Sequence, residues 1–447
     1  MMKTPIYDFV QSYIQSHTAR FHMPGHKGKP YLGCEAGDIT EIDGADVLYS
    51  ACGIIDESER NASVLFHTAH TFYSTEGSSL AIRAMLALVQ EQSNDERPLI
   101  LAARNAHKAF VYGCALLDVR VEWIYPEQSH HVCDATITPS QLQKRLAEQK
   151  EKPSAVYVTS PDYLGNISDI AGLSDVCDEY GIPLLVDNAH GAYLNCFEPS
   201  RHPIALGATL CCDSAHKTLP VLTGGAYLHV SPKAPKAYTE NARKALSLFA
   251  STSPSYLILQ SLDLCNAYIA DGYKARLTDC VQRVSDAKGY LQKRGFYVMD
   301  GESLKIVIDA KKSGYIGTEL ASTLTSQGIE CEFSDPDFVV LMATPENDPS
   351  DFDRLKTAFD AIEPRMPISS ELPALTAADL VLDLRQAVLG RSEMVALDDA
   401  VGRICAAPMV ACPPAVPVVI SGERITQAHI KAMKYYGYES INVVKDR

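Results

Sequence analysis

The sequence predicts an α/β fold built on a mainly parallel, doubly wound sheet. Short apolar runs of strand length alternate with segments of helical periodicity through the middle of the 447-residue chain. This alternation is typical of parallel sheets that are covered by helices. Polar residues follow several of the apolar runs, as expected where the strands of such a sheet end and ligands bind. A chain of this length exceeds one small core, so two or three folding units are expected.

The elements follow from these patterns in chain order. The first sixty residues are rich in Gly, Pro, His and Asp, and they predict a short helix at 7–16 followed by an extended arm. A long helical stretch at about 255–294 leads out of the sheet domain. The expected strands lie at 99–103, 121–125, 155–159, 184–187, 209–212 and 226–230, and again at 305–309 and 338–343. The expected helices lie near 78–92, 107–117, 140–150 and 172–180, and again at 317–327 and 351–362.

These elements predict three parts. Residues 1–60 form an N-terminal arm, 61–295 a large domain, and 296–447 the smaller C-terminal part, which contains a proline-rich linker with Pro364, Pro367 and Pro373.

Composition excludes several classes of function. The formal net charge of −15 argues against nucleic acid or an anionic membrane as a partner. Thirteen cysteines without a CxxC pair do not resemble a disulfide framework. Cys211 and Cys212 lie in a predicted buried strand and are expected to be small residues of the core. The start of the sequence lacks a signal-peptide pattern, and no run of 18 apolar residues exists. We therefore expect a cytoplasmic protein.

The most informative residues follow two consecutive apolar runs. The run at 183–186 ends in Asp187, and the run at 208–212 leads into Ser214-Ala215-His216-Lys217. A lysine amine can form a Schiff base with an aldehyde cofactor. A carboxylate can keep a pyridine nitrogen protonated, so that the ring withdraws electrons. Ser214 and His216 are placed to hold a phosphate. Together these residues predict a pyridoxal 5'-phosphate (PLP) site, although one Asp or Lys after a strand is usually an ordinary loop residue.

Further polar residues extend this site. Ser74-Thr75-Glu76-Gly77-Ser78-Ser79 precedes an apolar helix, so Gly77, Ser78 and Ser79 are candidates for phosphate binding, with simple N-capping as the alternative. His107 is a candidate for stacking on the pyridine ring and assisting proton transfer, or else it only caps a helix. Ala189 is small enough to pack against the other ring face, and His190 follows the same strand as Asp187. Thr223-Gly224-Gly225 is a candidate for close backbone approach, or an ordinary turn.

Metal binding is not expected. His22, His26, His130 and His131 offer imidazoles, but the spacing between 20 and 27 fits no closed zinc site. The segment from 20 to 27 contains no cysteine or carboxylate that could complete a site with its two histidines.

These motifs resemble the bacterial ornithine/lysine/arginine decarboxylase family of fold-type I PLP enzymes. The resemblance rests on Phe21-His22-Met23-Pro24-Gly25-His26-Lys27-Gly28, on the serine-rich motif that ends at Ser79, on Asn105-Ala106-His107-Lys108, on the segment from Val186 to Tyr193, and on Ser214-Ala215-His216-Lys217-Thr218. Ala400-Val401-Gly402-Arg403-Ile404 and Pro413-Pro414-Ala415-Val416-Pro417 resemble the family's C-terminal domain.

The resemblance implies an aspartate aminotransferase-like large domain with a seven-stranded sheet, a smaller α+β C-terminal domain, and a homodimer with shared active sites. Two segments depart from the family pattern. Cys412-Pro413-Pro414-Ala415 stands where Tyr-Pro-Pro-Gly is frequent, and Ser421-Gly422-Glu423 stands where Pro-Gly-Glu is frequent. Both bear on the substrate pocket.

The resemblance also implies the activity, which is decarboxylation of lysine, ornithine or arginine to give a polyamine or its precursor. The fold alone leaves aminotransfer or β-elimination open, and also a non-catalytic regulator. Under the decarboxylase hypothesis Lys217 and His107 are catalytic, and His216 or Lys217 returns a proton to Cα. Glu423, Glu41 and Asp162 are candidates for binding the distal cation of the substrate, although each would more ordinarily be a solvated surface carboxylate.

Overall fold

The computed structural model describes residues 2–127, 131, 133, 135–363, 365–369, 377–407 and 416–445. None of the helices in this part of the chain combines the length and the apolar character that a membrane crossing requires. Pro364, Pro373 and the Cys412–Ala415 segment lie outside the described residues, as does His130.

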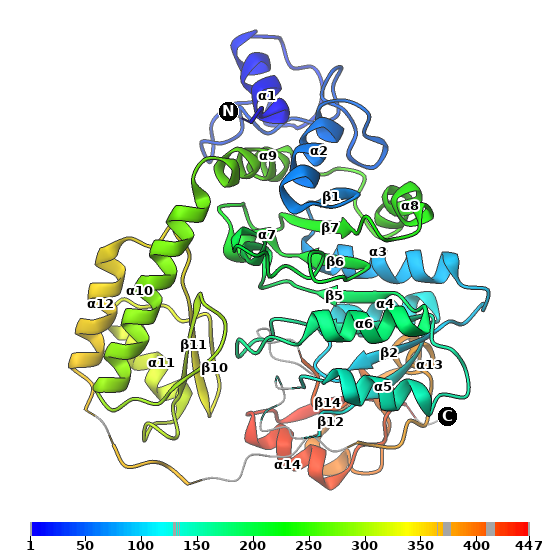
Figure 1. The fold of residues 1–447 in the computed structure, drawn as a ribbon, viewed down its shortest axis with the longest axis vertical. Coiled ribbons are helices and arrows are strands. Elements are labelled where there is room, and N and C mark those ends of the chain that lie inside the picture. Colours follow the sequence, from blue (N-terminus) through cyan, green and yellow to red (C-terminus); the bar gives the residue numbers. More distant parts are fainter. Residues whose placement is uncertain are drawn as a thin grey trace. The chain divides into compact units, whose positions relative to one another are not determined.

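A seven-stranded sheet is built from strands between residues 70 and 230, with the strand order β1-β7-β6-β5-β4-β2-β3 (Figure 1). Its strands are β1 (His70–Ser74), β2 (Leu99–Ala103), β3 (Arg120–Ile124), β4 (Ala155–Thr159), β5 (Leu184–Asp187), β6 (Leu210–Asp213) and β7 (Ala226–Val230). The strand pairs β4–β5 and β5–β6 are parallel, whereas β7 runs antiparallel to both β6 and β1. The predicted α/β class with a mainly parallel seven-stranded sheet is confirmed.

The helices of this region also follow the predicted pattern. They are α3 (Gly77–Gln92), α4 (Lys108–Leu117), α5 (Pro139–Ala147), α6 (Ile170–Tyr180), the short α7 (Ala215–Thr218) and α8 (Lys236–Ser247), with the 3-10 turn η2 (Ala192–Cys196). Strands β2, β5 and β6 are buried along their whole length, which explains why their sequences read as continuous apolar runs.

Three expectations about elements are corrected. The helical stretch at 255–294 is two helices, α9 (Tyr256–Ala270) and α10 (Tyr273–Lys293), because Gly272 between them has a positive φ of 74°. Strand β1 and helix α8 were not predicted from the sequence. The first sixty residues hold more than α1 (Pro5–Gln15), since η1 (Leu48–Ser50) and the start of α2 (Ile54–Phe66) also lie there.

Two smaller sheets follow. The order β10-β11-β9-β8 joins β8 (Val298–Met299), β9 (Lys305–Asp309), β10 (Phe333–Ser334) and β11 (Phe338–Met342), and the same region holds α11 (Gly317–Ser326) and α12 (Pro349–Asp360). The order β12-β14-β13 joins β12 (Ser392–Ala396), β13 (Cys405–Ala407) and β14 (Ser440–Val444), accompanied by α13 (Leu384–Leu389), η3 (Leu397–Asp399) and α14 (Gln427–Tyr435).

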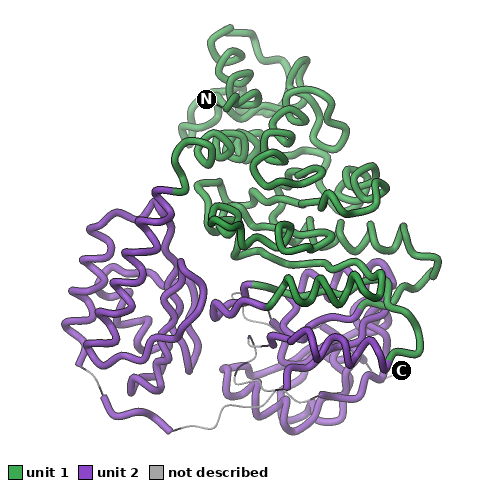
Figure 2. The backbone as a smooth tube through the Cα atoms, in the orientation of Figure 1, with its two compact units in different colours: residues 1–100, 149–160, 169–274 green, residues 101–148, 161–168, 275–447 purple. Residues whose placement is uncertain are grey.

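Contacts between Cα atoms group the chain into two compact units that are interleaved in sequence (Figure 2). Unit 1 comprises 1–100, 149–160 and 169–274, and unit 2 comprises 101–148, 161–168 and 275–447. The domain bounds 1–60, 61–295 and 296–447 stay a prediction.

Within unit 1, a buried carboxylate fixes the start of α1. Asp263 on α9 accepts hydrogen bonds from the backbone N–H groups of Ile6 (2.9 Å) and Tyr7 (3.0 Å) and from the Ser58 hydroxyl on α2 (2.5 Å). The first N–H groups of a helix have no partner inside the helix, so Asp263 takes the role of an N-cap from a distant segment. Burial raises the pKa of Asp263 to about 6, although these hydrogen bonds oppose the shift.

We predict that Asp263→Asn reduces the pH dependence of stability between pH 4 and pH 6. A carboxyl group whose folded-state pKa is raised binds more protons in the folded state, so its contribution to stability falls as pH rises through this window. The raised pKa corresponds to roughly 2–3 kcal/mol. Urea unfolding at pH 4.5 and pH 7 should show that wild-type protein gains more stability on acidification than the variant does. The exposed Asp175→Asn serves as control, and an unchanged pH dependence in Asp263→Asn would contradict the prediction.

Candidate functional site

Two neighbouring strands of unit 1 end in buried aspartates. Asp187 is the last residue of β5 and Asp213 the last residue of β6. The strands are parallel, and Asp187 lies opposite Cys212 in the register. The chain then turns from β6 directly into α7, which carries Lys217. The parallel pairing therefore brings the two predicted motifs to one edge of the sheet, as the sequence indicated.

Asp187 is buried without a full set of strong partners. Its carboxylate accepts hydrogen bonds from the Tyr157 hydroxyl (3.2 Å), the Ala189 N–H (3.2 Å) and, weakly, the Cys212 thiol (3.6 Å). Burial raises the pKa of Asp187, and the charge of Lys217 acts in the opposite direction. A buried carboxylate in this state favours a cationic partner, because desolvation penalises an ionised group that is not paired. A protonated pyridine nitrogen is such a partner.

Lys217 lies beside His190. The distance between Lys217 Nζ and His190 Nε2 is 3.0 Å, and the Lys217 side chain is only half-buried, so its amine is accessible. Ala189, between Asp187 and His190, is buried and carries no side chain beyond Cβ. The sequence predicted both residues as parts of the cofactor site, and the structure places them beside Asp187 and Lys217.

The serine-rich motif joins the same edge through hydroxyl groups. Ser214 Oγ donates to Ser78 Oγ over 2.8 Å, at the start of the 16-residue helix α3. The Gly77 N–H donates to the Gly224 carbonyl (2.7 Å), and a Cβ on Gly224 would lie 2.8 Å from the Thr75 carbonyl oxygen. The predicted close backbone approach of Gly224 is therefore real, and its neighbour is the Thr75 backbone. Hydroxyls beside a helix N-terminus suit a phosphate.

The two predicted histidines have distinct surroundings. His216 Nδ1 is 2.9 Å from the Gly225 carbonyl, and since a carbonyl only accepts, Nδ1 carries the proton. His107, in unit 2, is the N-cap of α4, where its Nδ1 accepts from the Ala109 N–H (3.1 Å). His107 therefore caps helix α4, as the alternative interpretation stated. Its stacking on the cofactor ring stays a prediction.

The sequence missed a buried cluster behind this edge. Asp213 accepts hydrogen bonds from His202 Nε2 (3.0 Å), His229 Nε2 (3.1 Å) and Asn188 Nδ2 (2.7 Å). Burial disfavours the charged carboxylate, but the two imidazoles outweigh this effect and hold the pKa of Asp213 below its usual range. The sequence feature that could have indicated this cluster was His229, a polar residue inside the otherwise apolar strand β7.

Tyr157, which donates to Asp187, was also missed. The sequence placed it correctly in a strand, but a buried Tyr in a strand is an ordinary core residue until its hydroxyl partner is known.

Three carboxylates were proposed to bind the distal cation of the substrate, and their surroundings differ from the solvent-exposed ones that were considered more ordinary. Glu423 is buried, accepts from the Ile420 N–H (2.7 Å) and the Tyr125 hydroxyl (3.3 Å), and lies 4.0 Å from Arg104. Asp162 is also buried, and both of its oxygens accept from Asn166. The solvated-surface alternative is therefore wrong for these two residues, because local backbone and side-chain donors compensate their burial. Glu41 is half-buried and accepts from the Thr40 hydroxyl.

The histidines of the N-terminal arm are engaged within unit 1. His22 Nε2 lies 2.7 Å from the Tyr13 hydroxyl, and His26 Nε2 lies 3.1 Å from Asp38. His26 therefore has a carboxylate neighbour in space that the nearby sequence did not indicate, because the arm folds back on itself over twelve residues. Cys211 and Cys212 are fully buried, as predicted, and no disulfide joins the cysteines of the described segments.

Comparison with known proteins supports the same assignment. The family described as "Orn/Lys/Arg decarboxylase, major domain" matches residues 4–313, and its C-terminal domain matches 373–440. The Bacillus subtilis protein YaaO is 28% identical over 97% of this chain and 94% of its own length. The Bacillus subtilis arginine decarboxylase is 26% identical over 96% of this chain and 92% of its own length. The solved structure of the Francisella novicida lysine decarboxylase has a TM-score of 0.82 at 17% identity and covers 99% of this chain and 81% of that chain.

The fold is that of the fold-type I PLP-dependent enzymes. The buried Asp187, the small Ala189, the half-buried Lys217 and the hydroxyl pair fit that cofactor. The chain belongs to the Orn/Lys/Arg decarboxylase family. It is accordingly an amino-acid decarboxylase, a carboxy-lyase whose cofactor is PLP.

We predict that Asp213→Asn destabilises the protein by about 3–5 kcal/mol at pH 7, because it removes one side of a buried charge network. The pKa of Asp213 is depressed, so its stabilising contribution is present at neutral pH and is lost on acidification. Urea unfolding should therefore show a smaller difference between wild type and variant at about pH 3 than at pH 7, because the loss begins only below the ordinary pKa of an aspartate. Asp178→Asn, which removes an exposed ion pair with Lys233, is the matched control and should cost less than about 1 kcal/mol. Equal effects of the two substitutions would contradict the prediction.

Proposed function

We propose that this enzyme decarboxylates a basic amino acid (lysine, ornithine or arginine) and releases a polyamine or its precursor. The observation that carries the proposal is the accessible Lys217 amine beside a buried Asp187 whose pKa is raised. PLP supplies the electron-withdrawing ring that accepts the electrons left behind when CO2 departs. The choice of a basic substrate is supported by the relatives named arginine decarboxylase and by the net charge of −15.

Each residue has a proposed role in this reaction. Lys217 would bind the cofactor covalently through Nζ, and the Asp187 carboxylate would pair with the ring nitrogen. The Tyr157 hydroxyl and the Ala189 N–H orient that carboxylate. His190, at 3.0 Å from Lys217 Nζ, can accept its proton and so leave a nucleophilic amine.

Other residues hold the phosphate and the ring. Gly77, Ser78, Ser79 and Ser214 would bind the phosphate at the start of α3. Ala189 and His107 would flank the ring. Because Nδ1 of His216 donates to Gly225, its Nε2 is the atom that would act on a substrate proton or on the phosphate.

Aminotransfer and β-elimination use the same cofactor and the same lysine, so the Lys217–Asp187 arrangement alone does not distinguish them from decarboxylation. A non-catalytic regulator would not need that arrangement.

We also propose a cytoplasmic homodimer with shared active sites, which sedimentation velocity of the holoenzyme would check. A fully active monomer would refute the dimer.

Lys217→Ala should abolish the visible absorbance of the lysine-bound cofactor, because it removes the amine proposed to form the Schiff base. The measurement is an absorbance spectrum of the purified protein, followed by borohydride reduction and peptide mapping of the wild type. A pyridoxyl group on a different lysine would show that the assignment of Lys217 is wrong. Lys233→Ala, an exposed lysine of unit 1, should leave the spectrum unchanged.

Asp187→Asn should retain some PLP and lose nearly all turnover. The lost charge-assisted contact to the ring nitrogen should weaken cofactor binding by about 1.5–3 kcal/mol. Turnover should fall further than binding, because the ring nitrogen is no longer kept protonated. Fluorescence titration with PLP and steady-state rates at saturating PLP separate the two effects. Turnover near that of wild type under these conditions would rule out Asp187 as the ring partner.

Assay of an amino-acid panel tests the function itself. We expect CO2 release from at least one of lysine, ornithine and arginine, with kcat/KM above that for neutral and acidic amino acids. A neutral or acidic amino acid with the highest kcat/KM would keep the decarboxylase and overturn the basic substrate. Keto acid or ammonia without CO2 would favour the aminotransferase or lyase alternative.

A further inference from the structure

The ends of strands β5 and β6 present different groups on the two faces of the sheet. Side chains of consecutive strand residues point to opposite faces. On one face, the Cys212 thiol lies 3.6 Å from the carboxylate of Asp187, its partner in the register. On the other face, Asn188 Nδ2 donates to Asp213 Oδ1 over 2.7 Å. The residue directly after Asp187 therefore reaches the buried Asp213 network, behind the face that carries the proposed cofactor residues.

The Asp213 carboxylate is held by three side-chain donors of unit 1. Asn188 makes the shortest of these hydrogen bonds, and Nε2 of His202 and of His229 lie at 3.0 and 3.1 Å. His202 Nδ1 accepts from the Ile204 N–H, so its ring donates through Nε2. All four side chains of this network are fully buried. A buried carboxylate with three donors has little freedom to move, which makes it a fixed anchor for the Asn188 amide.

The anchored amide belongs to the turn that carries Ala189 and His190, two of the predicted cofactor residues. The Asn188 carbonyl accepts from the Gly191 N–H (2.8 Å), which closes the turn. A Cβ at position 191 would lie only 2.0 Å from Asn188 Oδ1, so the amide packs directly against the turn. The Asn188 side chain is thus enclosed between this turn and Asp213, and a shift of the amide would move the turn with it.

The turn in its place brings His190 to Lys217. The distance between Lys217 Nζ and His190 Nε2 is 3.0 Å, and since an ammonium group only donates, Nε2 accepts. Lys217 itself lies on the segment that follows Asp213, where its N–H donates to the Ser214 carbonyl (3.0 Å). Asp213 is therefore next to the lysine segment in sequence, and through Asn188 it binds the histidine segment.

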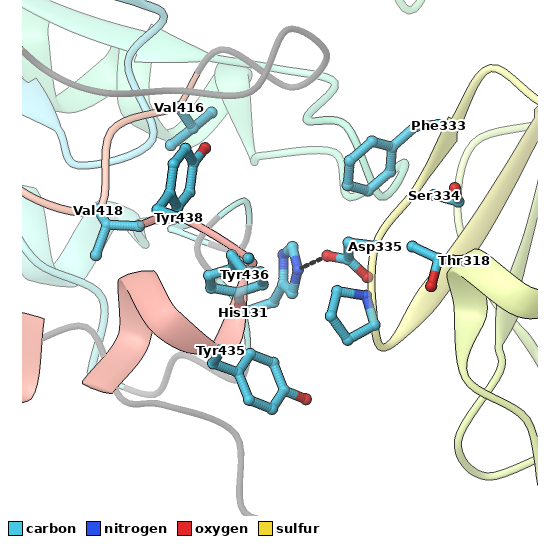
Figure 3. Close-up of a pocket in the computed structure, with 12 residues that line it drawn as sticks. His131, Thr318, Phe333, Ser334, Asp335, Val416, Val418, Tyr435, Tyr436 and Tyr438 are labelled. Carbon is cyan, nitrogen blue, oxygen red and sulfur yellow. Dashed lines mark hydrogen bonds and ion pairs between the residues drawn. The ribbon is translucent and has the colours of Figure 1, made fainter. Parts of the chain in front are cut away.

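A second buried histidine–aspartate pair, in unit 2, has no such connection. His131 and Asp335 line a cavity of about 290 Å³ (Figure 3). His131 Nε2 lies 2.5 Å from Asp335 Oδ2, and His131 Nδ1 accepts from the Cys133 N–H (3.1 Å). These three residues lie outside the predicted cofactor motifs. A buried pair of this kind is therefore not by itself a sign of function, and the feature that distinguishes the Asp213 network is its partner Asn188.

We propose that Asn188 is a positioning residue of the cofactor site. Its amide binds Asp213 and holds the turn 188–191, so that His190 meets the Lys217 amine. In this role Asn188 does not touch the cofactor and acts only through its neighbours in the turn. The role rests on the proposed function, in which Lys217 is the lysine that binds PLP.

The test follows how fast the full-length protein, freed of cofactor, binds added PLP at different pH, using the visible absorbance of the lysine-bound cofactor. Only the unprotonated Lys217 amine reacts, so the pH of half-maximal rate reports how tightly the amine holds its proton. An acceptor such as His190 favours the protonated amine. Asn188→Ala should therefore lower the half-maximal pH by about 0.5 or more. Gly191→Ala, which keeps the amide but displaces it, should act in the same direction.

Asn266→Ala is the matched control. Asn266 is a fully buried asparagine of unit 1, and its Nδ2 donates to the Tyr73 hydroxyl (2.7 Å) and the Ser58 carbonyl (3.0 Å). Its loss should destabilise the protein in urea unfolding, as Asn188→Ala does, and should leave the half-maximal pH unchanged. That pH compares rates within one variant, so a smaller folded fraction does not alter it.

Two results would overturn the proposal. Half-maximal pH values equal to that of wild type in Asn188→Ala and Gly191→Ala would show that Asn188 only stabilises the fold. An equal shift in Asn266→Ala would assign the effect to a general loosening of unit 1. If both alanine variants fail to fold, Asn188→Ser, whose hydroxyl is a shorter donor, should give a smaller shift in the same direction, and an unshifted value would again overturn the role.

The outcome is separable from that of the proposed function. Visible absorbance that persists in Lys217→Ala would overturn the cofactor lysine and, with it, the role of Asn188. Wild-type protein that binds PLP through Lys217, together with unshifted Asn188 variants, would remove only the positioning role.

Discussion

The burial of two aspartates at neighbouring strand ends is the constraint on which the candidate site depends. An ionised carboxylate in the protein interior costs several kcal/mol unless charges or hydrogen bonds compensate it. Asp213 is compensated by two imidazoles and an amide, and its pKa is held low. Asp187 has a hydroxyl, one backbone N–H and a thiol, and its pKa is raised.

This difference separates a structural carboxylate from one that is prepared for a ligand. Asp213 completes its network within the chain and fixes the turn that leads from β6 to Lys217. Asp187 lacks a strong cation partner of its own, and a pyridinium nitrogen would lower its pKa and complete the pair.

Glu423, a candidate for binding the distal cation of the substrate, has a local structural role. Its carboxylate is held by the Ile420 N–H and the Tyr125 hydroxyl near Arg104, while the Arg104 guanidinium donates to the carbonyls of Pro417 and Val418 (2.8 and 3.0 Å). These contacts tie the segment 416–423 to the loop that follows β2. A carboxylate engaged in this way orders the segment, and an ammonium of a substrate would have to compete with its present partners.

The sequence by itself determined the strands from β2 to β7, because each is a short apolar run bounded by turn residues and this signal is local. It also determined which polar residues stand at the ends of β5 and β6, and hence that Asp187 and Lys217 lie at the same edge of the sheet. The residue types alone were enough to predict the PLP site, because such a site needs a lysine, a carboxylate and small hydroxyl residues at strand ends.

Only the tertiary structure decided which carboxylates are buried and what compensates them. Asp213 meets His202 and His229, and Asp263 meets the start of α1 more than 250 residues away. The antiparallel direction of β7 and the desolvation of Glu423 and Asp162 were equally beyond local patterns. Desolvation depends on which distant elements pack together, and the free energy of a buried charge is set by those neighbours rather than by the residues beside it in sequence.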